Sequence, residues 1–184
     1  MAALVGFVLG VERRPLSSIG VRPPRELPVV GGVVPDLGVG PLVGVLGWSV
    51  VGFVGTVVLT TGVYRLYGRF ELETPEGFVE EQAGRGPVSY LITGVSAGVV
   101  ESVLYQGYLI GRVAELSGSV AIAAVFAWLV FTAVHSVGDT FGLAETVYIG
   151  VPGLAIVLLY VACESVVVVC LVHAVVNVLS FQSE

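Results

Sequence analysis

The chain has 184 residues, of which 55% are hydrophobic and only 12% are charged, whereas a soluble domain carries about 25% charged residues. All eight basic residues are arginine, and with 14 acidic residues the net charge is -6, so nucleic-acid binding has no electrostatic basis. The apolar residues come in long blocks, which predicts an integral membrane protein surrounded by the lipid bilayer.

Residues 1–38 form the N-terminal region. The first ten are apolar but too few to cross a bilayer, which takes about 20 residues. We expect this segment to be an interfacial anchor or the remnant of a longer helix. Residues 12–36 are rich in Arg and Pro, which is typical of a juxtamembrane linker.

Four or five windows beyond this region are long and apolar enough to be spans. They cover residues 39–64, 88–110, 120–137, 144–162 and 165–181. Only Cys163 and Glu164 separate the last two, so we expect a tight helical hairpin there. The predicted fold is all-α: a polytopic membrane helical bundle of about five transmembrane helices plus a short N-terminal apolar segment, multi-pass in the cell (plasma) membrane.

The segment between the first two spans, residues 65–87, contains three Arg and five Glu and is predicted to be a solvated loop. The linker and Arg112 together hold five Arg, against three in this loop. The positive-inside rule therefore places the linker and Arg112 in the cytoplasm.

A few polar side chains interrupt the spans. Glu101 lies in the second, His135 and His173 are the only histidines, and Asn177 follows His173 by one turn. Such groups are costly in a bilayer and usually face the bundle interior. Counted from one membrane face, all four lie roughly 13–25 Å deep in a core about 30 Å thick, so they can share a site.

These residue types suit hydrolysis. A carboxylate near an imidazole can take a proton from water, and an asparagine with a second histidine can donate hydrogen bonds to an oxyanion. His173 and Asn177 are four residues apart and share a helix face. Phe131 and His135 have the same spacing, which gives this histidine an aromatic neighbour.

The order of a Glu-containing helix, "FTAVH" and "HAVVN" resembles the CPBP family of CAAX-protease and bacteriocin-processing intramembrane proteases. That family includes the Rce1-type CAAX prenyl endopeptidases and the Abi proteins. Its motifs are EExxxR, FxxxH and HxxxN. Phe131 with His135 fits the second motif and His173 with Asn177 fits the third, so residues 88–181 are predicted to form a protease core.

The first motif departs from the family pattern. Aligned on Glu101, its second Glu is Ser102 and its Arg is Gln106. Removing one partner of a buried charge pair costs about 3–5 kcal/mol, while replacing both is often neutral. We therefore interpret the double change as compensated, with a neutral pair that can still form a hydrogen bond.

The resemblance implies that Glu101 and His135 activate water and that His173 and Asn177 stabilise the oxyanion, with Ser102, Gln106 and Phe131 in supporting positions. It is compatible with a divalent metal such as zinc, held by Glu101, His135 and His173. A mechanism without metal fits the same residues, and the sequence leaves both open. The expected substrate is a membrane-associated protein or peptide.

Two other functions remain open from the sequence. One is a proteolytically inactive family member that binds or regulates a membrane partner, which Ser102 and Gln106 favour. The other is a small transporter or proton relay, since Glu and His chains also serve that role. Asp139, four residues after His135, is either a residue that orients this histidine or part of a solvated loop.

Overall fold

The computed structural model describes residues 1–25, 40–70, 86–136 and 143–180, and every regular element in these ranges is a helix. The predicted all-α class is thus confirmed. Three helices are long and apolar enough to cross a membrane, over Gly40–Arg69, Pro87–Ser117 and Thr146–Cys163. Three further apolar helices in the described ranges, Ala2–Val11, Val120–Ser136 and Val166–Leu179, are shorter than the usual span.

The second long helix is continuous but changes its winding in the middle. It comprises α4 (Pro87–Glu101), the π-helical segment η4 (Ser102–Leu109) and α5 (Ile110–Ser117). It begins at Gly86 with Pro87 in the first turn, where the missing N–H costs nothing. It ends at Gly118, whose φ of 69° belongs to the left-handed region that favours glycine.

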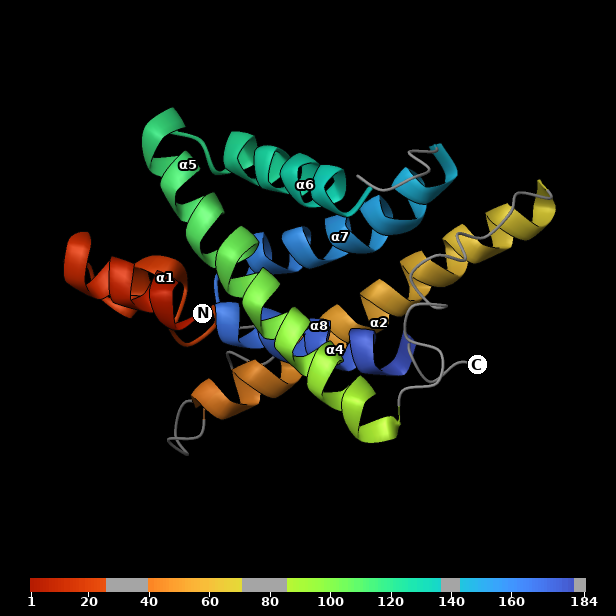
Figure 1. Ribbon diagram of the computed structural model, residues 1–184, viewed down its shortest axis with the longest axis horizontal. Coiled ribbons are helices and arrows are strands. Elements are labelled where there is room, and N and C mark those ends of the chain that lie inside the picture. Colours follow the sequence, from red (N-terminus) through yellow and green to blue (C-terminus); the bar gives the residue numbers. More distant parts are fainter. Residues whose placement is uncertain (26–39, 71–85, 137–142, 181–184) are drawn as a thin grey trace.

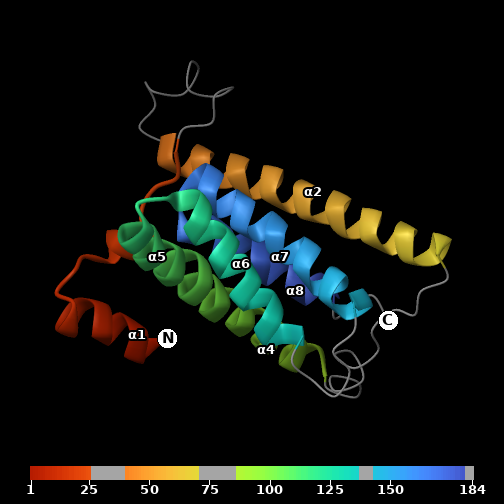
Figure 2. The same cartoon turned by 90° about the horizontal axis from the view of Figure 1, so that it is seen from above.

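The helices pack as a bundle around α8 (Val166–Ser180) and α7 (Leu143–Cys163). α4 lies against α8, α6 (Val120–Ser136) against α7, and α2 (Gly40–Arg69) covers the other side of the α7–α8 pair (Figures 1 and 2). Only Glu164 and Ser165 join α7 to α8, as the expected hairpin requires. α2 extends five residues beyond the predicted end of its span, so Arg65 and Arg69 are helical.

Glycines allow α4 and α8 to approach at backbone distance. A Cβ added at Gly98 would lie 2.5 Å from the backbone N of Ala174, and one at Gly94 would lie 3.0 Å from the backbone N of Val178. Small residues commonly permit such close packing between membrane helices. This contact places Glu101, one turn after Gly98, beside the middle of α8.

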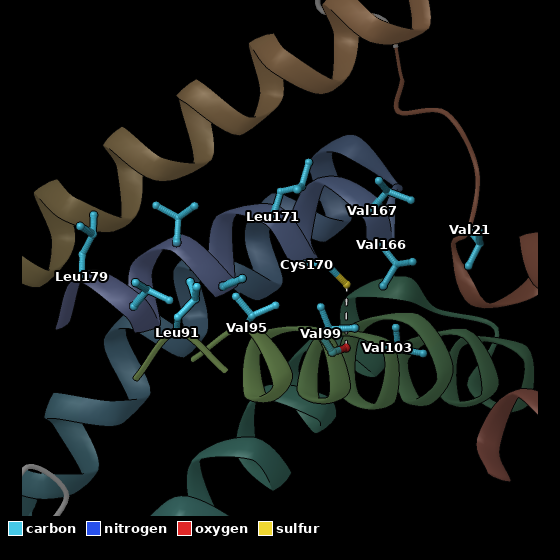
Figure 3. A pocket seen from close by; sticks show the side chains of 13 residues that line it. Val21, Leu91, Val95, Val99, Val103, Val166, Val167, Cys170, Leu171 and Leu179 are labelled. Carbon is cyan, nitrogen blue, oxygen red and sulfur yellow. Dashed lines mark hydrogen bonds between the residues drawn. The ribbon is translucent and has the colours of Figure 1, made fainter. Parts of the chain in front are cut away.

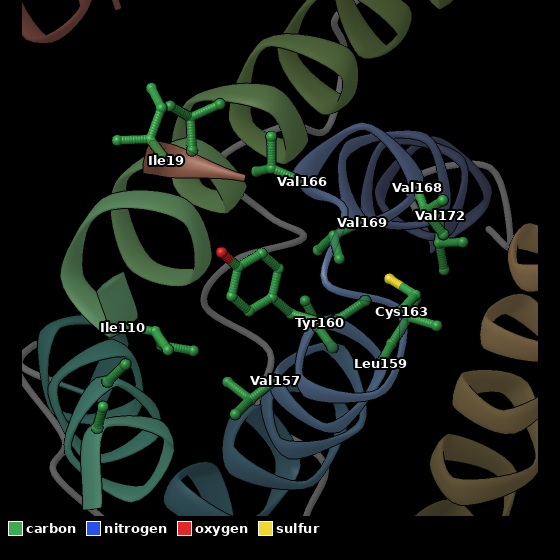
Figure 4. Packing of buried hydrophobic residues seen from close by; sticks show 14 of the residues in the cluster. Ile19, Ile110, Val157, Leu159, Tyr160, Cys163, Val166, Val168, Val169 and Val172 are labelled. Carbon is green, nitrogen blue, oxygen red and sulfur yellow. The ribbon is translucent and has the colours of Figure 1, made fainter. Parts of the chain in front are cut away.

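The buried apolar core lies where η4, α6, α7 and α8 meet. It contains Tyr160 and Val157 of α7, Val169 and Val172 of α8, and Ile110 (Figure 4). The N-terminal region contributes to it, because Val8 is 0% and Ile19 1% exposed. This region forms α1 (Ala2–Gly6), the π turn η1 (Phe7–Val11) and the 3-10 turn η2 (Leu16–Ile19). Residues 1–25 therefore contact this core mainly at these two points.

Candidate active site

Glu101, the last residue of α4, lies between the two histidines of the chain. Its Oε1 is 3.5 Å from Nε2 of His135 on α6, and its Oε2 is 3.5 Å from Nε2 of His173 on α8. The structure thus brings together ionisable groups from three helices. The side chains of Glu101, His135 and His173 are 23%, 27% and 8% exposed, so the cluster is sheltered but open on the side of Glu101 and His135.

His135 is oriented by its own helix. Its Nδ1 lies 2.8 Å from the backbone carbonyl oxygen of Phe131, one turn earlier. A carbonyl oxygen only accepts hydrogen bonds, so Nδ1 carries the hydrogen. The Phe131 ring lies against the imidazole with centroids 4.2 Å apart, and the Tyr105 ring meets Phe131 edge-on at 5.3 Å. These contacts fix the ring with Nε2 toward Glu101.

His173 is oriented by a different helix. Its Nδ1 lies 3.2 Å from Oγ of Ser102, the first residue of η4, and Ser102 is fully buried. A serine hydroxyl can either donate or accept here. Ser102 therefore links the helix that carries Glu101 to the helix that carries His173, across 71 positions of sequence.

Gln106 does not form the expected pair with Ser102. No hydrogen bond joins these two residues, both in the described part of the chain, because the Ser102 hydroxyl bonds to His173 instead. Gln106 is only 1% exposed, and its Oε1 has no hydrogen-bond partner within the described residues. The hydrogen bond that a neutral pair allows is therefore not formed, since tertiary packing directs Ser102 toward α8.

The change in winding directly after Glu101 was not predicted. A π-helical segment bonds residue i to i+5, is rare, and occurs frequently at functional sites. Here it covers Ser102, Tyr105 and Gln106, all buried. Its residues keep ordinary right-handed backbone angles at both ends, and we found no signal in the sequence that marks it.

Asn177 is not joined to this cluster by a hydrogen bond in the described part of the chain. It lies on α8 one turn after His173 and is half-buried. Within the described residues it makes no hydrogen bond to Glu101 or to either histidine. Asp139, the candidate from the sequence for orienting His135, lies outside the described residues.

The donor set of two histidines and a glutamate is one that zinc uses in catalytic sites. Within the described ranges, however, no group of three or more His, Cys, Asp or Glu side chains is arranged so that it could hold a metal ion.

An apolar groove of about 540 Å³ shares α4 and α8 with the cluster. Its lining is almost entirely aliphatic and includes Val95 and Val99 on α4 and Leu171 on α8 (Figure 3). Cys170 is the most polar lining residue, and its thiol lies 3.9 Å from the carbonyl oxygen of Val99. Cys163 and Cys170 are both free thiols.

One comparison with known families gives a match. The family model described as "Type II CAAX prenyl endopeptidase Rce1-like" matches residues 84–179, just over half of the chain. The matched stretch runs from just before α4 almost to the end of α8, and it contains Glu101 and both histidines. No curated protein and no solved structure matches the chain.

Proposed function

The chain belongs to the Rce1-like family of type II CAAX prenyl endopeptidases, and from this premise we propose that it is an intramembrane endopeptidase. The proposed reaction is hydrolysis of a peptide bond in a membrane-associated protein or peptide. The observation that carries the proposal is the position of Glu101 between two histidines. Both present Nε2 to its carboxylate, while their Nδ1 atoms have different hydrogen-bond partners.

The hydrogen bonds at the two Nδ1 atoms support different roles for the histidines on either side of Glu101: His135 as a base and His173 as a hydrogen-bond donor. Neutral His135 has its hydrogen on Nδ1, so its Nε2 faces Glu101 with a free lone pair. When the Ser102 hydroxyl donates to Nδ1 of His173, neutral His173 carries its hydrogen on Nε2. One histidine is then suited to accept a proton, and the other to donate a hydrogen bond.

In the proposed reaction, Glu101 and His135 take a proton from water as its oxygen bonds to the carbonyl carbon of the scissile peptide. The carbonyl electron pair moves to oxygen, where hydrogen bonds from His173 and Asn177 stabilise the charge. Asn177 is assigned this role because it follows His173 on the same face of α8. Re-formation of the carbonyl breaks the C–N bond, and the proton passes to the leaving amine.

The apolar groove supports a substrate that is itself apolar near the cleaved bond. Most of its lining consists of aliphatic side chains of the two helices that carry Glu101 and His173, and such a lining favours hydrocarbon over water. We assign to it the apolar part of a membrane-anchored substrate. Replacing Val99 or Leu171 with Asn is expected to raise KM for such a substrate.

The test is cleavage of membrane-anchored peptides, with and without a prenylated carboxyl-terminal CAAX motif, by the purified protein in lipid vesicles. Glu101→Gln and His135→Ala are each expected to lower kcat about 10²–10⁴-fold, the usual contribution of general acid–base catalysis. Equal cleavage by the wild type and both variants contradicts the assignment. A chelator series on the active protein measures whether a divalent metal such as zinc contributes.

A second function is favoured by one observation. Ser102 and Gln106 stand where the family motif has a glutamate and an arginine, and Gln106 has an unpartnered Oε1 within the described residues. A proteolytically inactive protein that binds or regulates a membrane partner fits this change. Ser102→Glu combined with Gln106→Arg distinguishes the two functions: an inactive wild type and an active restored variant identify the inactive family member.

A further inference from the structure

The segment formed by residues 12–25, which we name the N-terminal strap, lies outside the stretch that matches the family model. It nevertheless contacts both helices that meet at Ser102 and His173. On one side it lies along η4 and α5, and on the other it reaches the turn between α7 and α8 (Figure 4, where Ile19 lies close to Val166).

Charged and polar side chains join the strap to α5 and to the end of η4. The Glu12 carboxylate accepts hydrogen bonds from Nε of Arg112 at 3.0 Å and from the Tyr108 hydroxyl at 3.1 Å. Arg14 donates to both carboxylate oxygens of Glu115, at 2.5 and 2.6 Å. The Arg112 side chain is only 13% exposed, so its pairing with Glu12 is sheltered from solvent.

Backbone contact on the same face requires glycine. A Cβ added at Gly107, within the π-helical segment, would lie 2.5 Å from the carbonyl oxygen of Ile19. One at Gly111 would lie 3.2 Å from the carbonyl oxygen of Ser18. The strap backbone therefore rests directly on η4, five positions after Ser102.

On the other side, the strap satisfies backbone groups that the helix ends leave without partners. The Val166 N–H at the start of α8 donates to the Gly20 carbonyl at 2.8 Å, and the Arg25 N–H donates to the Cys163 carbonyl at 2.9 Å. The Ser165 hydroxyl donates to the Arg22 carbonyl at 2.7 Å. The start of α8, seven positions before His173, is thus held by the strap.

We infer that the N-terminal strap is a positioning element of the candidate active site. It holds η4 and α8 at the one relative position in which the Ser102 hydroxyl meets Nδ1 of His173. Both anchor points lie only about 8–10 Å along their helices from these residues, at 1.5 Å per residue. A slide of about 1 Å between the helices would break the Ser102–His173 hydrogen bond, which is already 3.2 Å long.

The two histidines make this inference measurable without any substrate. Protein labelled with ¹⁵N-histidine gives signals from only two imidazole rings, each with an Nδ1 and an Nε2 resonance. Nδ1 of His135 bonds within its own helix and serves as the internal reference. Gly107→Ala is expected to move the Nδ1 signal of His173 toward that of an imidazole without this hydrogen bond, while the His135 signal stays. Gly111→Ala, with its looser contact, should produce a smaller shift in the same direction.

The ion pair between Glu12 and Arg112 gives a second variant in case Gly107→Ala does not fold. Arg112→Glu should shift the His173 signal, and the exchange Glu12→Arg with Arg112→Glu should restore it. Arg14→Gln is the matched control, since its pair with Glu115 is exposed and such pairs contribute little. Unchanged His173 signals in folded Gly107→Ala and Arg112→Glu overturn the inference, and so do equal shifts of both histidines.

The kinetic part of the inference rests on the proposed proteolysis, but the NMR part does not. If the wild type cleaves, Gly107→Ala should lower kcat about tenfold or more at unchanged KM, because small displacements of catalytic groups are costly. If the wild type does not cleave and the His173 signal still responds, the positioning role stands and the proposed function fails.

Discussion

Charged groups at the N-terminal strap lie in direct contact, whereas those at Glu101 are held apart. Arg14 meets Glu115 at 2.5 and 2.6 Å, and Nε of Arg112 meets Glu12 at 3.0 Å. Glu101 is 3.5 Å from each histidine, which is longer than a normal hydrogen bond. The first region uses charge to hold segments together. In the second region, the Glu101 carboxylate and the Nε2 atoms lack close hydrogen-bond partners inside an apolar bundle, which is costly. These atoms therefore remain available to a reactant.

The largest expected effect comes from neutralising one carboxylate in each region, which tests whether the two carboxylates serve different purposes. Glu101→Gln is expected to lower kcat about 10²–10⁴-fold with little change in Tm, because the amide keeps the shape and has no tight partner to lose. Glu12→Gln is expected to do the reverse and lower Tm with a smaller effect on kcat. Cleavage assays and thermal unfolding of both variants in the same lipid measure the contrast.

The contrast fails if Glu101→Gln unfolds the bundle, since the carboxylate would then be a structural group. It also fails if Glu12→Gln lowers kcat as strongly as Glu101→Gln while Tm is kept.

A smaller effect is expected from the hydrogen bond between the Ser102 hydroxyl and Nδ1 of His173. Ser102→Ala leaves Nδ1 of His173 buried without its partner. Without this bond the imidazole is no longer held in its orientation, and because small displacements of catalytic groups are costly, kcat should fall about tenfold to hundredfold. Ser102→Thr keeps the hydroxyl and is the matched control. A Ser102→Ala enzyme with the pH–rate profile and kcat of the wild type would show that His173 needs no orienting partner.

The meeting of Glu101 with both histidines was predictable because each is a costly polar group in an apolar span, and three such groups are stabilised by facing one another. The all-α bundle was predictable for a related reason, since only a helix satisfies its backbone within a single span. The partner of Ser102 was not predictable. Spacing of four residues pointed to Gln106, but close packing of α4 on α8 at Gly98 brings His173 nearer.

The N-terminal strap shows a second limit. Its Arg- and Pro-rich composition is typical of a linker, and nothing local distinguishes Glu12 from a solvated residue. Its partners Tyr108 and Arg112 lie about a hundred positions away and are set by tertiary packing. The extent of the N-terminal region and of the protease core, residues 88–181, stays a prediction.

The close contact between α4 and α8 at Gly98 can be tested by adding a methyl group to it. Gly98→Ala places a methyl group 2.5 Å from the backbone of α8, and overpacking of this kind costs about 1–3 kcal/mol. We expect a lower Tm and a weaker Ser102–His173 hydrogen bond. Gly55→Ala on α2, where the added Cβ meets nothing within 4 Å, is the control. If both substitutions have the same effect, the close approach of α4 and α8 is not what spaces the site.

The smallest expected effect is a pH dependence confined to the strap. The hydrogen bond from Arg112 holds the pKa of Glu12 below its ordinary value of 4.5, outweighing the opposite effect of partial burial. A carboxyl whose pKa is lower in the folded state stabilises the protein above the unfolded pKa. This contribution is lost as the pH falls through the folded pKa.

Tm of the wild type should therefore hold from neutral pH to about 5 and decline below about 4.5. Glu12→Gln should begin from a lower Tm and decline less steeply over that window, because it has no carboxyl at this position to protonate. Identical slopes for the two proteins below pH 4.5 would mean that Glu12 does not couple the strap to α5, and that the close charge contacts there are no more stabilising than the open ones around Glu101.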